Sequence, residues 1–287
     1  MAHVAVVADT TSYVPAELTR ERGIELVSLY VNWDDRSERE SDMADFDEFY
    51  ARLRTSEQPP TTSQPSIGDF LEVYEPLIDA GRDIVSVHIS GQISGTVDSA
   101  RQAAERLAER TGEQRIHVVD STSVAGGMAL VVLAAASAAM SGASAEEVAK
   151  HAQAARAEVK MWFSLDTLEY LRRGGRIGAA SAWLGSALKI KPILTVDERI
   201  EPIERVRTSA RALQRLLDYL QQCKDDGADG WLVQHIQAPD QAAKLAAVAQ
   251  EIMGTPPLLV SEVGPVLGTH GGPGMLGVGA APAKYFE

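Results

Sequence analysis

Cysteine, positive charge and long apolar runs are all scarce in this chain of 287 residues. The single cysteine, Cys223, excludes an internal disulfide framework and a thiolate metal cluster. The 27 basic residues stand against 40 acidic ones, so a net charge of −13 argues against broad nucleic-acid binding and against stable adsorption to anionic lipids. The longest apolar stretch, residues 128–140, is too short to span a bilayer and predicts a buried helix.

Several site signatures are also missing. The chain does not start with a basic segment followed by an apolar core, which favours a cytoplasmic location with at most transient membrane contact. No histidine, cysteine or carboxylate set has metal-ligand spacing, and no glycine-lysine-serine/threonine loop is present, so neither a metal, a cofactor nor an ATP site is expected. His88, His117 and His235 lie in strand-like segments without companions, which favours packing roles.

Alternating apolar runs and helical patterns predict an α/β fold with two domains, residues 1–158 and 159–287. The first should be a three-layer domain with a parallel sheet, the second an α/β domain with a largely antiparallel or mixed sheet. Expected strands in the first half are residues 3–8, 25–31, 83–89 and 116–119, and expected helices are 15–22, 46–53, 67–80, 96–108, 124–140 and 144–158. The acidic stretch 33–44 is expected to be an irregular surface excursion.

In the second half, five strand-like runs and two long helical patterns alternate. Expected strands are residues 162–165, 192–196, 199–206, 231–236 and 258–263, and expected helices are 209–223 and 239–253. The Asp197-Glu198 step between two of these runs predicts a hairpin.

The stretch 261–279 surrounds His270 with glycines and two prolines, directly after an apolar strand. Glycine permits positive φ and close backbone approach, whereas proline restricts φ, so this loop is predicted to place His270 and nearby amides accurately. A tight turn between two strands is the simpler alternative.

Three polar clusters follow apolar runs at residues 9–12, 60–66 and 90–96. A polar turn between a strand and a helix N-terminus is suited to binding an anion, because free amides and the positive end of the helix dipole point outward there. We therefore expect these turns to converge in space. Ser94 also has a purely structural interpretation as a helix N-cap.

Together these motifs resemble the DegV family of bacterial fatty-acid-binding proteins. The matching segments are 9–12, 62–66, 89–96, 120–121, 171–177 and 264–274. Gly91 departs from the family pattern, where many relatives have a second serine, and Ala125 stands where a serine before glycine is common.

The resemblance implies a long apolar tunnel closed by groups that hold a carboxylate. Thr62 or Ser63, Ser94 and His270 are the candidate ligands. They are supported by the backbone at Gly91, Gly95, Gly268 and Gly271. The resemblance also implies that Arg173 and Arg176 lie at the ligand entrance, facing a partner kinase, with Arg173 the stronger candidate. A solvated helix end is the alternative for both arginines.

The function that follows is a non-catalytic carrier of a long-chain fatty acid. A separate fatty acid kinase would phosphorylate the bound carboxylate, and the acyl-phosphate would enter phospholipid synthesis. Each buried methylene contributes about 0.8 kcal/mol, so a sixteen-carbon tail makes a gross contribution of about 12 kcal/mol. The tail therefore supplies the affinity, and the head group supplies the orientation. The alternatives are an acyl hydrolase that uses Ser94 as nucleophile and His270 as base, and a regulatory lipid sensor.

Overall fold

The computed structural model describes residues 3–43, 45–184 and 190–287. The strands are β1 (Val4–Asp9), β2 (Ile24–Val27), β3 (Tyr30–Trp33), β4 (Arg36–Arg39), β5 (Thr61–Ser63), β6 (Asp83–His88), β7 (Ile116–Asp120), β8 (Lys160–Ser164), β9 (Lys191–Asp197), β10 (Arg199–Val206), β11 (Gly230–His235), β12 (Val260–Glu262) and β13 (Leu276–Ala281). The α-helices are α1 (Ala16–Glu21), α2 (Phe46–Thr55), α3 (Ile67–Asp79), α4 (Thr96–Thr111), α5 (Ala125–Met140), α6 (Ala145–Glu158), α7 (Glu169–Arg173), α8 (Ser209–Asp225), α9 (Pro239–Met253) and α10 (Pro265–Gly271). Four 3₁₀ turns complete the described elements: η1 (Thr10–Ser12), η2 (Glu40–Asp42), η3 (Gly178–Trp183) and η4 (Ala283–Tyr285).

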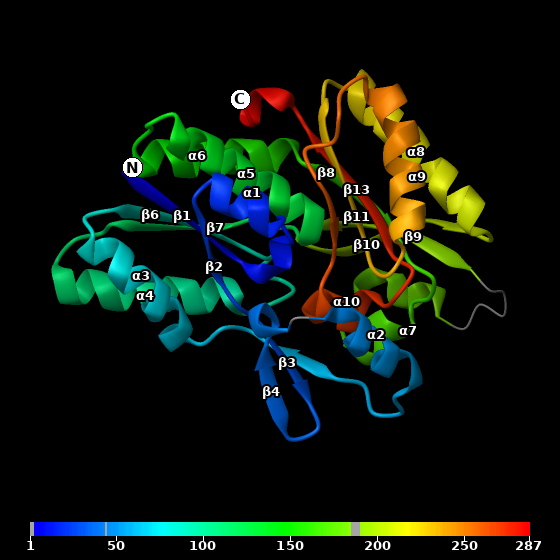
Figure 1. Ribbon diagram of the computed structural model, residues 1–287, viewed down its shortest axis with the longest axis horizontal. Helices are drawn as coiled ribbons and strands as arrows, with labels where there is room; N and C mark the ends of the chain where they lie inside the picture. The colour runs from blue at the N-terminus through cyan, green and yellow to red at the C-terminus, as the bar shows by residue number, and fades with distance from the viewer. Residues whose placement is uncertain (1–2, 44, 185–189) are drawn as a thin grey trace.

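Two large sheets alternate with three helical layers (Figure 1). The first sheet has the order β2-β1-β6-β7 and is parallel throughout, with α3 and α4 on one face and α5 and α6 on the other. The second has the order β10-β9-β8-β13-β11-β12 and is antiparallel except between β11 and β12. Helices α8 and α9 cover its outer face. The predicted α/β fold with one parallel and one mixed sheet is thus confirmed, and the division at residue 158, between α6 and β8, stays a prediction.

Helix α5 lies between the two large sheets and contacts β1 and β6 on one side and β13 and β11 on the other. Its alanine- and valine-rich sequence is buried almost all around its circumference. A helix can be apolar on every side only when it is covered on every side, so the expected buried helix at 128–140 is confirmed. One continuous apolar cluster therefore runs from Val4 in the first sheet to Phe286 near the C-terminus.

Two predictions in the first half were wrong. The expected strand 25–31 is two strands: β2 belongs to the first large sheet, and β3 belongs to a small sheet with the order β4-β3-β5. The chain turns between them at Ser28 and Leu29, where the Leu29 amide donates to Oγ1 of Thr10. The expected irregular surface excursion 33–44 is largely exposed, as predicted, but it is not irregular, because it contains β4, which forms a hairpin with β3. The buried side chain of Glu40 follows β4. The β3–β4 hairpin projects from the body next to α2 and α10 (Figure 1).

The glycine-rich stretch 261–279 is also more regular than predicted. Most of it forms helix α10 and strand β13 rather than a loop, and His270 lies in the last turn of the helix. Glycine was misleading here because its absent side chain serves packing: a Cβ at Gly268 would lie 2.1 Å from the Tyr50 hydroxyl oxygen. The hairpin predicted at Asp197-Glu198 is confirmed between β9 and β10.

Candidate ligand-binding site

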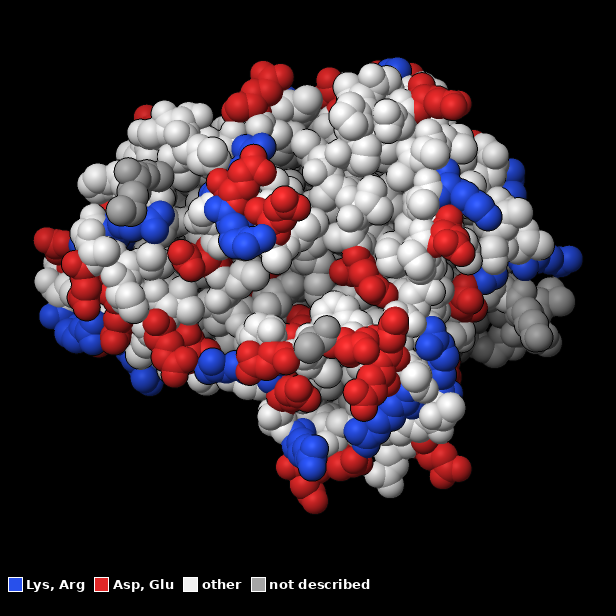
Figure 2. All heavy atoms as spheres, viewed as in Figure 1, with Lys and Arg blue, Asp and Glu red and all other residues white. Residues whose placement is uncertain are grey.

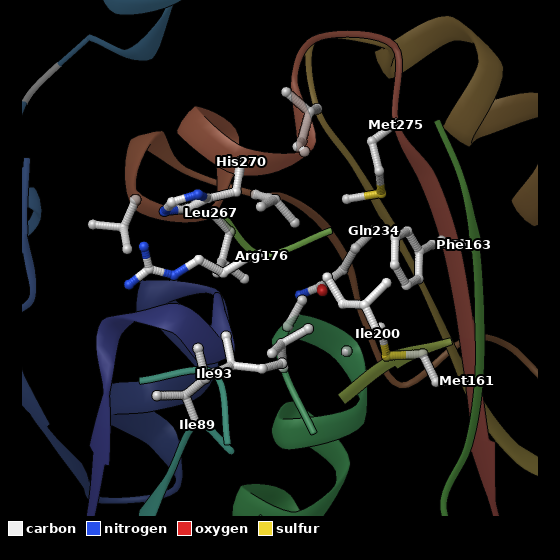
Figure 3. A pocket seen from close by; sticks show the side chains of 18 of the residues that line it. Ile89, Ile93, Met161, Phe163, Arg176, Ile200, Gln234, Leu267, His270 and Met275 are labelled. Atoms are coloured by element: carbon white, nitrogen blue, oxygen red, sulfur yellow. The ribbon is translucent and has the colours of Figure 1, made fainter. Parts of the chain in front are cut away.

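A cavity lies between the first sheet, α5, α10 and the second sheet. The empty space there, part of which is open to solvent, amounts to about 880 Å³. Its lining is mostly apolar and comes from both halves of the chain; the polar side chains among the lining residues are Thr62, Ser94, Arg176, Gln234 and His270. The cavity is therefore an apolar chamber with few, separately placed polar groups (Figure 3).

The central polar contact joins His270 on α10 to Thr62 on β5, with 2.9 Å between Nε2 and Oγ1. The His270 side chain is buried, and its Nδ1 has no hydrogen-bond partner among the described residues. Burial, and then the positive charge of Arg176, lowers the pKa of His270 to about 4. His270 is therefore neutral at pH 7 and carries hydrogen-bonding capacity that the protein does not use.

The position of His270 depends on a close packing contact with Gly174, just after α7. A Cβ at Gly174 would lie 2.1 Å from Nδ1 of His270, although the backbone there has an ordinary helical φ of −75°. The glycine of the arginine-glycine element thus makes room for the imidazole ring.

Helix α10 is held by side chains that are distant in sequence. Oε1 of Glu40 accepts from the amide of Val266 at 2.8 Å, and the Tyr13 hydroxyl accepts from the amide of Leu267 at 3.1 Å. The Tyr13 hydroxyl in turn donates to Glu40 at 2.9 Å. The first amides of a helix have no partners within it, so these contacts cap α10 and orient the helix that carries His270.

Of the predicted ligands, Thr62, Ser94 and His270 all line the cavity. Ser63 does not, because successive side chains of β5 point to opposite faces; it is exposed and accepts from Nδ2 of Asn32. Ser94 does not cap α4 with its side chain: the N-cap is Gly95, and Oγ of Ser94 pairs with Oγ1 of Thr96 at 2.8 Å.

The four predicted backbone positions have different surroundings. Gly271 lines the cavity, and Gly268 packs against Tyr50 on the far side of α10. Gly95 packs against the Gln64 side-chain amide, whose atoms would lie 2.5 Å from a Cβ at this position. The Gly91 amide donates to Asp120 at 3.2 Å, so it is not free to bind a ligand as the sequence had suggested.

The two arginines differ in place and pairing. Arg176 lines the cavity and also an adjoining outer hollow that includes Pro59, Pro60 and Arg173. Arg173 lines only the outer hollow, and its guanidinium donates to Glu169 at 2.7 Å. Arg176 has no carboxylate partner within the described part of the chain. Arg176 is therefore the cation beside His270 (Figure 3), whereas Arg173, the stronger candidate for the entrance, lies in the outer hollow.

In the turn after β1, donors that the motif suggested for an anion pair with a carboxylate of the protein itself. The Asp9 carboxylate is fully buried and accepts from the amides of Thr11 and Ile89 and from Nδ1 of His88. Oγ of Ser86 lies 2.6 Å from Nε2 of His88 and completes a closed polar network. The protein's own carboxylate thus occupies these donors, and His88 has the packing role that its surroundings predicted.

Other chemistry finds no support in the geometry. Nowhere in residues 3–43, 45–184 or 190–287 do three histidine, cysteine or carboxylate side chains gather to hold a metal ion. No carboxylate orients His270 within the same residues, and Ser94 is bonded to Thr96 rather than to the imidazole. Cys223 is buried in α8, where burial raises the pKa of its thiol to about 11. None of the described helices is long and apolar enough to cross a bilayer.

Sequence reasoning missed several residues of this site: Tyr13, Glu40, Gly126, Gly174 and Gln234. Glu40 and Tyr13 act across more than 220 positions, and no local pattern marks such contacts. Gly174 lay in a recognised motif, so only its partner was missed.

The chain matches the model described as "Uncharacterised protein, DegV family" over residues 3–283. It belongs to the DegV family. A DegV domain-containing protein of Streptomyces coelicolor is 40% identical over 279 residues, covering 96% of this chain and 97% of the relative.

Solved DegV structures have the same fold. A DegV family protein from Thermus thermophilus, described for its fatty acid binding, has a TM-score of 0.86 and 35% identity, and the match covers 97% of this chain and 99% of that one. DegV of Bacillus subtilis, described as a fatty acid binding protein, has a TM-score of 0.86 and 32% identity, with 98% and 100% covered. The expected family and its two-sheet fold are confirmed.

Proposed function

We propose that this DegV protein binds a long-chain fatty acid, with the tail in the apolar cavity and the carboxylate near Thr62, Ser94, Arg176 and His270. The observation that carries the proposal is the neutral, buried imidazole of His270, with an unpaired Nδ1, beside an arginine that lacks a carboxylate partner. These groups offer donors and positive charge to an anion at one part of an otherwise apolar chamber. The fatty acid binding of relatives from Thermus thermophilus and Bacillus subtilis supports the same ligand class.

The second part of the proposal is presentation of the carboxylate to a separate ATP-dependent fatty acid kinase in the cytoplasm, feeding phospholipid synthesis. The outer hollow supports it, since it shares Thr62, Arg176 and His270 with the cavity and adds Arg173, an exposed side chain of a type frequent in interfaces. On the face in Figure 2, basic side chains are interspersed with acidic ones, which fits a protein partner better than nucleic acid.

No observation specifically supports either alternative, the acyl hydrolase or the lipid sensor. A hydrolase would need Ser94 within reach of His270 and a group that orients the imidazole. A lipid sensor would use the same cavity and differ only in its partner, so a kinase assay separates it from a carrier.

The test of binding is organic extraction of purified protein followed by mass analysis. We expect close to one fatty acid per chain; recovery of a nucleotide or sugar from folded protein would contradict the proposal. Titration of delipidated protein with a fatty acid and with the matching fatty alcohol then isolates the contribution of the carboxylate to the affinity. Thr62→Val should weaken binding of the fatty acid more than binding of the alcohol. Ser63→Ala, on the other face of β5, should change neither affinity.

The test of presentation is incubation of the loaded protein with a purified fatty acid kinase and ATP. We expect acyl-phosphate to form, and Arg173→Ala to reduce the rate while the affinity for fatty acid stays within a few-fold. Normal binding without any acyl-phosphate would favour the sensor.

A further inference from the structure

A second polar group lies in the cavity, apart from His270 and Thr62. The Gln234 side chain on β11 is only 2% exposed, and its Oε1 is buried without a hydrogen-bond partner among the described residues. Its Nε2 donates to the carbonyl oxygen of Ser12 at 3.1 Å and to Oγ of Ser261 at 3.0 Å. A carbonyl oxygen only accepts, so the atom that faces Ser12 must be the nitrogen, and the unpaired atom is an acceptor.

The space beside this oxygen is kept open by glycine. Gly126 lies in the first turn of α5, and a Cβ there would lie 3.3 Å from Oε1 of Gln234 and 2.6 Å from Cδ1 of Leu232. Gly126 and Gln234 both line the cavity. At Gly126 the first turn of α5 therefore brings only backbone close to this oxygen. The amide of the next residue, Gly127, is already used, since it donates to the carbonyl oxygen of Val124 and to Sδ of Met161.

An acceptor that is buried and unpaired destabilises the empty site, so a ligand that supplies a donor there gains free energy. The walls around it, which include Phe163, Met161 and Ile200, offer no donor of their own. In Figure 3 the Gln234 amide lies between His270 and Arg176 on one side and Phe163 and Met161 on the other. The unpaired oxygen therefore faces the part of the cavity proposed for the tail rather than for the carboxylate.

We propose that Gln234 Oε1 and the first turn of α5 form a second subsite that binds a hydroxyl group within the acyl chain, so that this protein prefers a hydroxy fatty acid. The inference rests on the proposed fatty-acid function and narrows its ligand class. A hydroxyl at the matching carbon donates to Oε1 and so pairs the buried acceptor. A keto group at the same carbon only accepts and leaves Oε1 unpaired.

The test uses delipidated wild-type protein and a positional set of monohydroxy octadecanoic acids, each with its keto counterpart, and unsubstituted octadecanoic acid. Calorimetric titration should find at least one hydroxy isomer that binds roughly tenfold more tightly than octadecanoic acid and than its own keto counterpart. The inference is overturned if no hydroxy isomer exceeds octadecanoic acid, or if keto and hydroxy chains bind alike. Octadecanoic acid that binds well without any hydroxyl preference refutes only this subsite. Failure of every acid to bind refutes the proposed function as well.

Two variants localise the effect. Gly126→Ala places a methyl group 3.3 Å from Oε1 and requires the Leu232 side chain to shift, and it should abolish the preference for the hydroxy isomer. Gly277→Ala is the matched control, since it adds a methyl group to the cavity lining at an ordinary contact of 3.4 Å from Cβ of Phe163. It should keep the affinity ratio between hydroxy and unsubstituted chains. Equal ratios in wild type, Gly126→Ala and Gly277→Ala would place the hydroxyl elsewhere and contradict the role of Gln234.

Discussion

Glu40 accepts a hydrogen bond of 2.8 Å from the amide of Val266, which lies 226 positions further along the chain. The contact caps α10 and so links the start of the chain to the helix that carries His270. Oε2 of the same carboxylate is buried without a partner among the described residues. Burial raises the pKa of Glu40 to about 6, so its charge changes in the mildly acidic range.

The first prediction concerns stability and pH. Because the pKa of Glu40 rises from 4.5 to about 6 on folding, the native state binds the additional proton between these values. The free energy of unfolding should therefore fall by about 2 kcal/mol through this group as the pH rises from well below 4.5 to well above 6, with about 1.3 kcal/mol of the fall between these two values. Denaturant titrations of wild type and Glu40→Gln across this range isolate the effect, since the difference between them should change with pH by that amount. Parallel curves would show that Glu40 does not titrate in this window.

The second prediction concerns the protonation of His270. In the ligand-free protein its imidazole should stay neutral down to about pH 4, because burial and Arg176 oppose the charge. A bound carboxylate supplies an opposite charge and should raise the pKa, so that fatty acid binding takes up protons in mildly acidic solution. NMR titration of the imidazole signals with fatty acid, and with the uncharged fatty alcohol as control, measures both values. An identical pKa with acid, with alcohol and without ligand would mean that the carboxylate is not near His270.

The third prediction tests the packing of Gly174 on His270. Gly174→Ala keeps an allowed backbone but forces its methyl group against Nδ1, so it should displace the ring from Thr62 and weaken binding of fatty acid at least about tenfold. Gly175→Ala is the control: its φ of +69° makes alanine strained by about 1 kcal/mol, yet nothing lies within 4 Å of the added atom. It should lower stability without changing the preference for acid over alcohol. Equal binding losses in both variants would assign the effect to general destabilisation.

The fourth prediction separates the two arginines. Arg176→Gln should weaken binding of the fatty acid roughly tenfold, leave the fatty alcohol nearly unaffected and raise the pKa of His270, because it removes the neighbouring positive charge. Arg173→Gln should leave both affinities within a few-fold, since Arg173 lies in the outer hollow and pairs with Glu169. A larger loss of acid binding in Arg173→Gln would reverse these assignments.

Periodicity and composition predicted most elements of this fold, because both are local properties. The alanine-rich stretch from Met128 to Met140 needed no partner to be identified as a buried helix. The alternating strands and helices of the first half predicted a parallel sheet for the same reason. The glycine-rich stretch around His270 was misassigned as a loop, since glycine that enables close packing has the same local signature as glycine that enables a turn.

What the sequence by itself determined is the α/β class, the family resemblance and the candidates Thr62, Ser94 and His270, since these follow from residue types and their order. Only the tertiary structure decided that Ser63 points away, that Arg176 rather than Arg173 reaches the cavity, and that Glu40, Gly174 and Gln234 shape the site. The physical reason is that side-chain direction, pairing and burial depend on contacts between segments that are far apart in the chain. A pattern of residues encodes which groups are present, and packing determines which of them remain unpaired.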